Sequence, residues 1–395
     1  MFKKVNISDL YVGLWMLYYL QGTLYPSGGV ISQGILGLLL LISIYYFVLT
    51  NLQSKLNTYF KALNVLLAMF TVYGAFYIFF GNTIYIGHIL SQPVKKYYYL
   101  KNIFMSFLPL YFFYTATKSG WLTLNRIKTY LFLFFLTYLA LYYRTEIERV
   151  ALVDREEITN NISYEFLSLI PMLFIVDMKR LWRYGMLALC FIIVVAGMKR
   201  GAILIGVLVV LWFFIFELKA ARPSQKIFTF LLLIVAMTGI LLFALNLYDN
   251  SPFFQLRVQQ TIEGDTSGRN YIYANFWKYF INQTNSLHLF FGNGADSTIT
   301  ISGGYAHNDW LEIGINNGIF GVVLYFLYWV AFAREWWKTK NTEIIFYCLG
   351  SLLIIYFLAS LFSMSYNSVK ITAALCFGYC WAKSSMWKDM SKIGV

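Results

Sequence analysis

The segment GGVISQGILGLLLLISIYYFVLT, residues 28–50, decides the class of fold. It contains no charged residue, and its length matches the roughly 17–25 apolar residues that carry an α-helix across a bilayer. Comparable apolar runs recur along the chain, whereas the short alternating strands of a membrane barrel do not. The segment is therefore one of many predicted transmembrane helices.

The composition of all 395 residues supports this prediction: 59% are hydrophobic and only 12% are charged. Soluble domains carry about twice that charged fraction, and lipid tolerates only helices or closed barrels. We expect an all-α polytopic membrane protein with about 12 transmembrane helices in one bundle. The expected helices cover residues 9–26, 28–50, 62–81, 99–117, 127–143, 162–176, 181–197, 201–217, 227–247, 310–333, 342–362 and 366–382.

The net charge of +13 is mainly a topology signal. No small-residue cleavage site follows the first apolar run, so we expect no removed signal peptide. With both ends in the cytoplasm, most of the 31 basic residues fall in cytoplasmic connections, as the positive-inside rule requires. Anionic membrane lipid is the expected partner of this charge, and nucleic acid is not.

The chain divides into three predicted parts: transmembrane helices in 1–247, a large loop on the outer side in 248–309, and transmembrane helices with a cytoplasmic tail in 310–395. A loop this long in a compact protein is usually functional or disordered. Its aromatic residues favour short amphipathic helices lying flat on the outer face. The charged stretch 144–157 reads as a solvated connection.

Two basic motifs fall on the predicted outer side. Lys199 and Arg200 lie in a tight hairpin between two helices, where they either bind a partner or lift their charges to the headgroups. Arg257 and Arg269 flank a polar loop with Ser267 and Gly268 before a helix. Each guanidinium group either binds two phosphate oxygens at once, as a fork, or pairs with a nearby acid on a solvated loop. The nearby acids are Glu263 and Asp265.

A third motif, GGYAHNDWLEIGINNGIFG, covers residues 303–321. Asp309 and Glu312 fit a capping box at the start of a helix. Three glycines spaced along that helix predict a small face for tight packing; they are Gly314, Gly318 and Gly321. His307 is needed for neither feature, and a neutral imidazole near pH 7 can act as a general base.

Metal and cofactor motifs do not occur in the sequence, which has no HExxH, no nucleotide-binding glycine loop and no nucleophile elbow. The four cysteines lie inside apolar runs, and we interpret them as small packing residues. We therefore expect no metal and no cofactor. What remains is three arginines, a lysine and a histidine, which suit a phosphate-bearing substrate and proton abstraction.

In this order, the motifs resemble the bacterial O-antigen ligase and polymerase superfamily. The resemblance rests on GMKRGAIL (197–204), Arg257, SGR (267–269), GNG (292–294) and AHNDWLEIGINNGIFG (306–321). It covers about residues 185–335 closely, and the rest matches only as generic membrane helices.

The resemblance implies a GT-C-like fold and a metal-independent, inverting glycosyltransferase in the bacterial inner membrane. Its active site and the large loop 248–309 would face the periplasm. Such enzymes take a glycan from undecaprenyl pyrophosphate and join it to an acceptor hydroxyl. His307 would be the base, Asn308 would orient the site, and cations would bind the pyrophosphate and stabilise the leaving anion. These cations are Lys199, Arg200, Arg257 and Arg269.

Polymerases and ligases share these motifs. A polymerase joins lipid-linked repeat units, whereas a ligase moves the finished glycan to lipid A–core. The aromatic composition favours a polymerase here, with chain-length regulator and flippase proteins as candidate partners. A flippase is the alternative from another class, although paired, mirrored halves with midplane charges, typical of transporters, are not seen. A scaffold protein would need neither His307 nor the arginines.

Overall fold

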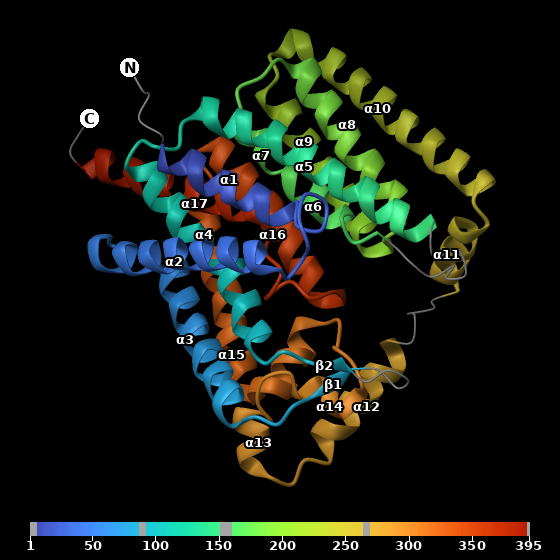
Figure 1. The fold of residues 1–395 in the computed structure, drawn as a ribbon. Helices are drawn as coiled ribbons and strands as arrows, with labels where there is room; N and C mark the ends of the chain where they lie inside the picture. The colour runs from blue at the N-terminus through green and yellow to red at the C-terminus, as the bar shows by residue number, and fades with distance from the viewer. Residues whose placement is uncertain (1–5, 87–91, 151–159, 264–268, 393–395) are drawn as a thin grey trace.

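The computed structural model describes residues 6–86, 92–150, 160–263 and 269–392. Helices dominate this part of the chain (Figure 1). Their bounds are α1 Ile7–Tyr19, α2 Val30–Gln53, α3 Thr58–Phe80, α4 Tyr97–Lys118, α5 Leu124–Val150, α6 Ser163–Leu169, α7 Met172–Ile175, α8 Arg180–Ala196, α9 Arg200–Ala220, α10 Pro223–Asn250, α11 Pro252–Ile262, α12 Arg269–Ile281, α13 Ser286–Phe291, α14 Ser297–Ser302, α15 Asp309–Trp337, α16 Glu343–Phe362 and α17 Ile371–Lys392. Two short antiparallel strands, β1 (Tyr85–Ile86) and β2 (Gln92–Pro93), pair beside them.

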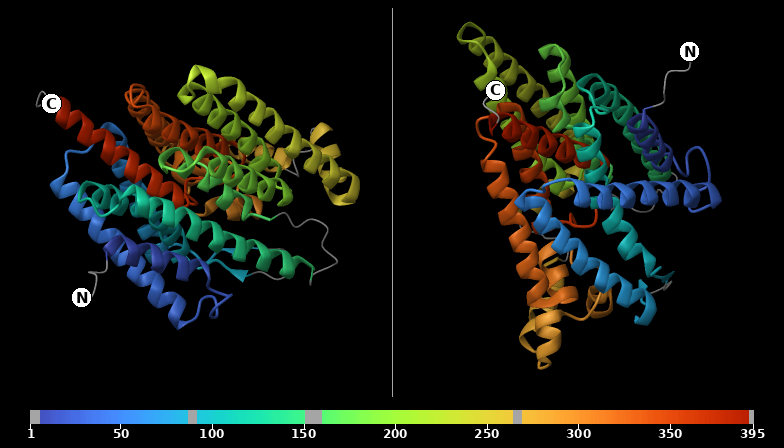
Figure 2. Two further views of the ribbon diagram at one scale, coloured as in Figure 1. Left: turned by 90° about the horizontal axis from the view of Figure 1, so that it is seen from above. Right: turned by 90° about the vertical axis from the view of Figure 1, so that its left-hand side faces the viewer.

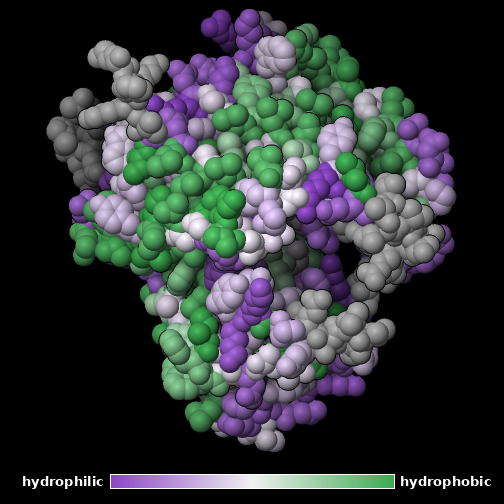
Figure 3. Space-filling view, in the orientation of Figure 1, coloured by the Kyte–Doolittle hydropathy of each residue, from purple (hydrophilic) through white to green (hydrophobic). Residues whose placement is uncertain are grey.

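Seven helices of the described chain are long and apolar enough to cross a membrane: α2, α3, α5, α9, α10, α15 and α16. Many large apolar side chains are exposed, as expected for a surface that faces lipid. Figure 3 shows such side chains gathered over the upper part of one face, with hydrophilic ones more frequent toward the lower end, where α12, α13 and α14 lie. The predicted helical, polytopic membrane class is confirmed, and the total of twelve spans stays a prediction.

The bounds of the predicted helices differ from the structure, and in three helices the difference changes an end or divides the helix. The first ends at Tyr19, so α1 has only 13 residues. The predicted helix 162–176 is divided into α6 and α7 at Pro171, which lacks the N–H that a continuous helix requires. The last, α17, begins at Ile371, because residues 363–370 form a separate connection after α16.

The first part of the segment 144–157 is helical, and the prediction of a solvated connection is wrong there. Helix α5 continues to Val150, supported by an ion pair of 2.8 Å between Arg144 and Glu148, one turn apart. The Asn160 side chain also donates a hydrogen bond of 2.8 Å to Glu146. Residues 151–159 lie outside the described chain.

An aromatic core holds the central helices together. Tyr59 of α3 is buried against Phe332 of α15 and against Phe377 and Trp381 of α17. Helices α3 and α15 run side by side toward the end of the molecule where α12, α13, α14 and the strands lie (Figures 1 and 2). This packing fixes the later part of α15 against α3 and α17.

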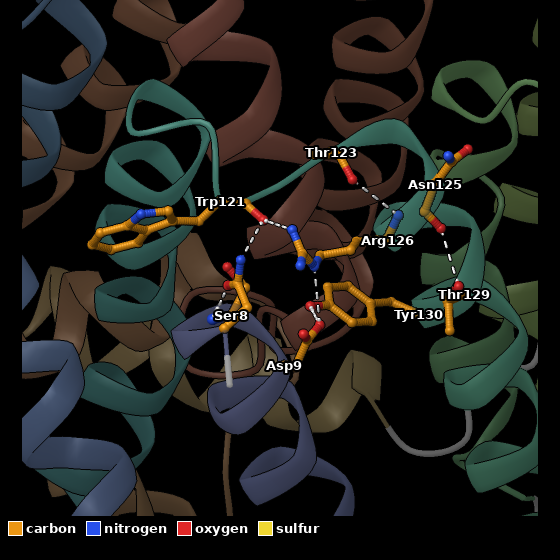
Figure 4. Close-up of polar contacts among 9 residues, drawn as sticks. Ser8, Asp9, Trp121, Thr123, Asn125, Arg126, Thr129 and Tyr130 are labelled. Atoms are coloured by element: carbon orange, nitrogen blue, oxygen red, sulfur yellow. Dashed lines mark hydrogen bonds and ion pairs between the residues drawn. The ribbon is translucent and has the colours of Figure 1, made fainter. Parts of the chain in front are cut away.

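The predicted cytoplasmic ends of several helices are held by ion pairs. Asp9 of α1 accepts a hydrogen bond from Tyr130 and lies 3.4 Å from the Arg126 guanidinium of α5 (Figure 4). Glu217, near the end of α9, is buried and lies 2.6 Å from the guanidinium of Arg183 in α8. These contacts join neighbouring helices at the end opposite the turn between α8 and α9.

Helix α15 is interrupted at Gly318, whose φ of 67° and ψ of −167° lie outside the helical region. The carbonyls of Ile315 and Asn316 accept hydrogen bonds from the N–H groups of Asn293 and Gly294, at 2.9 and 3.0 Å. A side chain at Gly318 would collide with the backbone around Phe290. The prediction that Gly318 serves helix packing is therefore wrong, because it breaks the helix and admits another backbone segment.

Candidate functional site

The Lys199–Arg200 motif lies in the tight turn predicted for it. Helix α8 ends at Ala196, Gly197 caps it, and Met198 adopts a left-handed φ of 54°. Lys199 then caps α9, which begins at Arg200. The Asn160 N–H donates a hydrogen bond of 3.0 Å to the Gly197 carbonyl, so the chain before α6 holds the turn in place. Both basic residues are thus fixed at one end of the α8–α9 pair.

This turn packs against the end of α16. A β-carbon added to Gly201 would lie 2.7 Å from a ring carbon of Phe362 and 2.8 Å from the Tyr164 hydroxyl. Both distances are shorter than ordinary contact, so only glycine allows this approach. The close contact brings the Lys199–Arg200 turn to the final residues of α16.

Arg269 and Asn308 converge on the same helix end. The Arg269 guanidinium donates a hydrogen bond of 2.8 Å to the Phe362 carbonyl, and the Asn308 amide donates one of 2.7 Å to the Leu361 carbonyl. The last carbonyls of a helix lack intrahelical partners and carry partial negative charge, which suits an arginine. The end of α16 therefore joins α12, α15 and, through Gly201, α9.

Asn308 also caps α15. Its side-chain oxygen accepts hydrogen bonds from the N–H groups of Trp310 and Leu311, at 2.9 and 3.1 Å. The predicted capping box of Asp309 and Glu312 is therefore wrong. Asparagine is as good a helix cap as aspartate, and the sequence alone did not separate the neighbouring candidates.

Asp309 is fully buried and ties α15 to the connection after α16. It accepts hydrogen bonds from the Tyr325 hydroxyl at 2.7 Å, from the Ser365 N–H at 2.9 Å and from the Tyr366 N–H at 3.0 Å. The Ser365 hydroxyl donates another. A buried carboxylate is tolerated because it has this full set of donors.

Glu312 is also fully buried and links the segment before His307 to α14. One carboxylate oxygen accepts hydrogen bonds from Thr298 and Asn316, and the other accepts one of 2.8 Å from the Ala306 N–H. Ala306 directly precedes His307. The position of His307 therefore depends on a carboxylate that the capping-box prediction assigned to another role.

His307 lies between Ala306 and the helix cap, in a left-handed conformation with φ 51°. Its side chain keeps access to solvent. Partial burial lowers the pKa of His307 below its ordinary 6.5, and the positive charges of Arg269 and Lys199 lower it further. The imidazole is thus neutral near pH 7 and able to accept a proton.

Tyr273 belongs to the same neighbourhood, although the sequence analysis did not select it. Burial raises the pKa of Tyr273, and nearby Arg269 and Asn308 oppose the increase. Its spacing of four residues from Arg269 on α12 places both on one helix face, which is a signal that could have identified it. The Leu361 and Phe362 carbonyls have no such signal, because every residue has a carbonyl.

The structure brings together four of the six predicted site residues: Lys199, Arg269, His307 and Asn308. Arg200 follows Lys199 as the first residue of α9. Arg257 belongs to α11, and its side chain is not among those described. The loop residues predicted beside it also lie outside the described chain; they are Asp265, Ser267 and Gly268.

Residues 185–326 match the protein-family model described as O-antigen ligase. This match supports the O-antigen ligase and polymerase superfamily. The matched segment begins within α8 and ends within α15, so it contains the Lys199–Arg200 turn, Arg269 and His307. The resemblance predicted from the sequence is confirmed. No curated protein sequence matches the chain.

The superfamily members share ligase and polymerase chemistry of the glycosyltransferase type. In the described chain, no group of three or more His, Cys, Asp or Glu side chains is arranged to hold a metal ion. The site instead offers a proton acceptor beside an arginine and a lysine. Such an arrangement can bind an anion and remove a proton from a nearby hydroxyl.

Proposed function

We propose that this chain is an O-antigen polymerase at the periplasmic face of the bacterial inner membrane. It transfers a glycan from undecaprenyl pyrophosphate to a hydroxyl of another lipid-linked repeat unit. One observation carries the proposal: Arg269 and Asn308 both bind the end of α16, and the charges of Arg269 and Lys199 act on His307. A cationic group and a neutral base therefore share one site.

Arg269 is suited to hold the donor pyrophosphate. Its bond to the Phe362 carbonyl uses Nη1 and fixes the guanidinium, which carries five N–H donors in total. The remaining donors can bind phosphate oxygens in a bidentate manner, which a lysine cannot do. Lys199 and Arg200 add positive charge from the adjoining turn, and Arg257 is proposed to add a fourth cation.

His307 removes the acceptor proton. The acceptor hydroxyl gives its proton to the neutral imidazole as its oxygen bonds to the anomeric carbon of the donor glycan. The bond between that carbon and the phosphate oxygen breaks with inversion, and its electron pair leaves with undecaprenyl pyrophosphate. Cations around the phosphates stabilise the negative charge that develops there. No metal ion is required in this sequence of steps.

Substrate binding should strengthen the base. Arg269 and Lys199 lower the pKa of His307, so an anion bound between them offsets part of their effect. The imidazole then becomes more basic when the donor is in place. By linkage, protonation of His307 strengthens anion binding by the same factor. The site thus couples the base to the presence of the donor.

An O-antigen ligase is the second candidate function. The family model that matches residues 185–326 is described by that name. A ligase would use the same cations and the same base, with a sugar of lipid A–core as the acceptor. The two functions differ in the acceptor, which lies outside the cation cluster.

A deletion strain examined by lipopolysaccharide gel separates the candidates. A polymerase predicts that the ladder is lost while a single repeat unit stays on the core, whereas a ligase predicts a core without any O-antigen. Complementation with His307→Ala, at equal membrane abundance, should not restore the pattern. An unchanged gel in the deletion strain, with no second gene of this type present, would refute both functions.

A further inference from the structure

A second site is formed by a cavity of about 1160 Å³ between α3, β1, α12 and the segment 291–303. These elements meet at the lower end of the molecule in Figure 1, where the strands and α14 lie. The cavity is larger than the roughly 300–1,000 Å³ typical of pockets for small ligands. Neither His307 nor Arg269 is among its lining residues, so it is distinct from the cation cluster.

The lining combines aromatic rings with neutral polar side chains. Tyr73, Phe76 and Phe291 contribute rings, and Asn82 and Thr300 contribute an amide and a hydroxyl. Among the described lining residues, none is Lys, Arg, His, Asp or Glu. Such a surface matches a ligand with apolar ring faces and a rim of hydrogen-bonding groups.

This chemistry suits neither of the two other parts of a lipid-linked glycan. A pyrophosphate in the cavity would find no cationic side chain among the described lining residues. A polyprenyl chain would cover neutral polar side chains without offering them hydrogen bonds. Neutral sugar rings satisfy both requirements, because each has apolar C–H faces and hydroxyl groups around its edge.

The wall of the cavity is connected to His307. Helix α14 contributes Thr300 to the lining, and Thr298 of the same helix donates a hydrogen bond to Glu312. The other oxygen of Glu312 accepts a bond from the Ala306 N–H, next to His307. A ligand in the cavity therefore lies against a helix that one carboxylate joins to the proposed base.

We propose that this cavity binds the neutral sugar rings of the acceptor glycan. The inference rests on the proposed function, and it names the site of the second substrate. The donor pyrophosphate occupies the cation cluster, while the acceptor glycan is held in the cavity beside α14.

The test uses the full chain in lipid nanodiscs and the variant Thr300→Trp. Thr300 is exposed and lines the cavity, so an indole there fills the space without disturbing the buried core. Thr284→Trp makes the same change at another exposed residue of the segment between α10 and α15, away from the lining. Asn82→Trp, at an exposed lining residue between α3 and β1, is a second blocking variant.

The probe is the lipid-free, phosphate-free repeat-unit oligosaccharide released from the polysaccharide of the producing strain. Saturation-transfer NMR should show contact between its ring protons and the protein. The signal should fall at least about tenfold in Thr300→Trp and Asn82→Trp, and stay unchanged in Thr284→Trp. Pyrophosphate binding, measured by ³¹P NMR, should be equal in all three variants, which shows that each remains folded.

Two results would overturn the inference: equal oligosaccharide binding in both blocking variants, or binding of geranylgeraniol instead of the oligosaccharide at the Thr300 wall. The latter would assign the cavity to an apolar chain. Turnover of lipid-linked glycan distinguishes a failure of the proposed sugar site from a failure of the proposed function. If turnover occurs and Thr300→Trp leaves the acceptor KM unchanged, the cavity proposal fails and the function stands. If the oligosaccharide binds at the Thr300 wall but no lipid-linked glycan is turned over, the function fails and the sugar site stands.

Discussion

Two groups of acidic side chains, one at each end of the helix bundle, are stabilised in different ways. At the predicted cytoplasmic end, Glu217 is paired with Arg183, and Asp9 lies beside Arg126. At the end that carries His307, Asp309 and Glu312 accept hydrogen bonds from hydroxyl, amide and peptide N–H groups.

The two groups differ in whether the acid neutralises a neighbouring cation. An acid that is paired with an arginine neutralises it, whereas an acid held by neutral donors does not. Within the described chain, Asp309 and Glu312 form no ion pair. These two acids therefore do not neutralise the positive charge that Arg269 places near His307, and this charge suits an anionic substrate. Ion pairs also occur on the predicted outer side, where Glu165 lies 2.7 Å from Lys370. The contrast therefore concerns the two acids that support the segment around His307, and in our proposal the positive charge beside them is functional.

The largest expected effect is that of His307→Ala on glycan transfer. Loss of a general base typically lowers the rate by about 10²–10⁴-fold. His288→Ala is the matched control, because His288 is exposed at the end of α13, and it should transfer glycan normally. The measurement is transfer by purified protein at equal amounts. Full activity of His307→Ala would remove the proposed base.

Stability measurements compare the two kinds of acid directly. Arg183→Met should lower the free energy of unfolding by about 3 kcal/mol, because Glu217 then stays buried without its closest cation. The double variant with Glu217→Leu should regain most of this loss. Asp309→Ala should cost about as much, because it leaves several buried donors without an acceptor.

No second substitution should rescue Asp309→Ala, because two of its donors are peptide N–H groups that a side-chain change cannot remove. Unfolding in detergent, followed by loss of helical circular dichroism, measures all of these variants. The comparison of the two ends would be wrong if Arg183→Met were as stable as the wild type, or if its double variant were no better.

Arg269→Lys separates the effect of positive charge from that of the two-pronged guanidinium group. The variant keeps the charge but loses the fork, so kcat/KM for the lipid-linked donor should fall by roughly tenfold, and Arg257→Lys should be impaired in the same direction. Arg126→Lys, at the ion-paired end, should transfer glycan normally. Donor titrations measure these values. Unimpaired transfer by both fork variants would exclude bidentate phosphate binding.

The smallest expected effect is a shift in the pH profile. The pKa of His307 lies below 6.5 in the folded protein, so transfer should fall only as the pH drops below that ordinary value. Below pH 6.5 the unfolded chain binds more protons at His307 than the folded protein does. The contribution of His307 to the free energy of unfolding is therefore present above pH 6.5 and is lost as the pH falls through the lowered pKa. Arg269→Gln removes a positive neighbour and should move the acidic limb of kcat/KM to higher pH. A limb that stays in place would show that Arg269 does not act on His307.

Much of the fold could be predicted from the sequence, because membrane helices are encoded by local apolar runs. Breaks within those runs were harder to place. Pro171 divides one predicted helix, and Gly318 interrupts another. Glycine in an apolar helix suits close packing as well as a break, and only the neighbouring segment 292–294 decides between them. Conversely, Arg144 and Glu148 extend α5 beyond its apolar part through an ion pair.

The site could be predicted only in part. His307 and Arg269 were selected because few side chains perform their chemistry, and residue type is visible in a sequence. The end of α16 that gathers Arg269 and Asn308 acts through the Leu361 and Phe362 carbonyls, which no sequence pattern distinguishes. Glu312 was assigned to a cap because the spacing allowed it, whereas tertiary contacts recruit it elsewhere.

The interruption of α15 has a consequence for how the protein is made. The carbonyls left by the break at Gly318 are satisfied by Asn293 and Gly294, which precede α15 in the chain. Those partners have therefore already emerged from the ribosome when the helix enters the insertion machinery. The segment 292–294 can therefore satisfy these carbonyls as soon as α15 has been made, without a partner from later in the chain. Deleting it should divert newly made chains to quality-control proteolysis before any glycan is encountered.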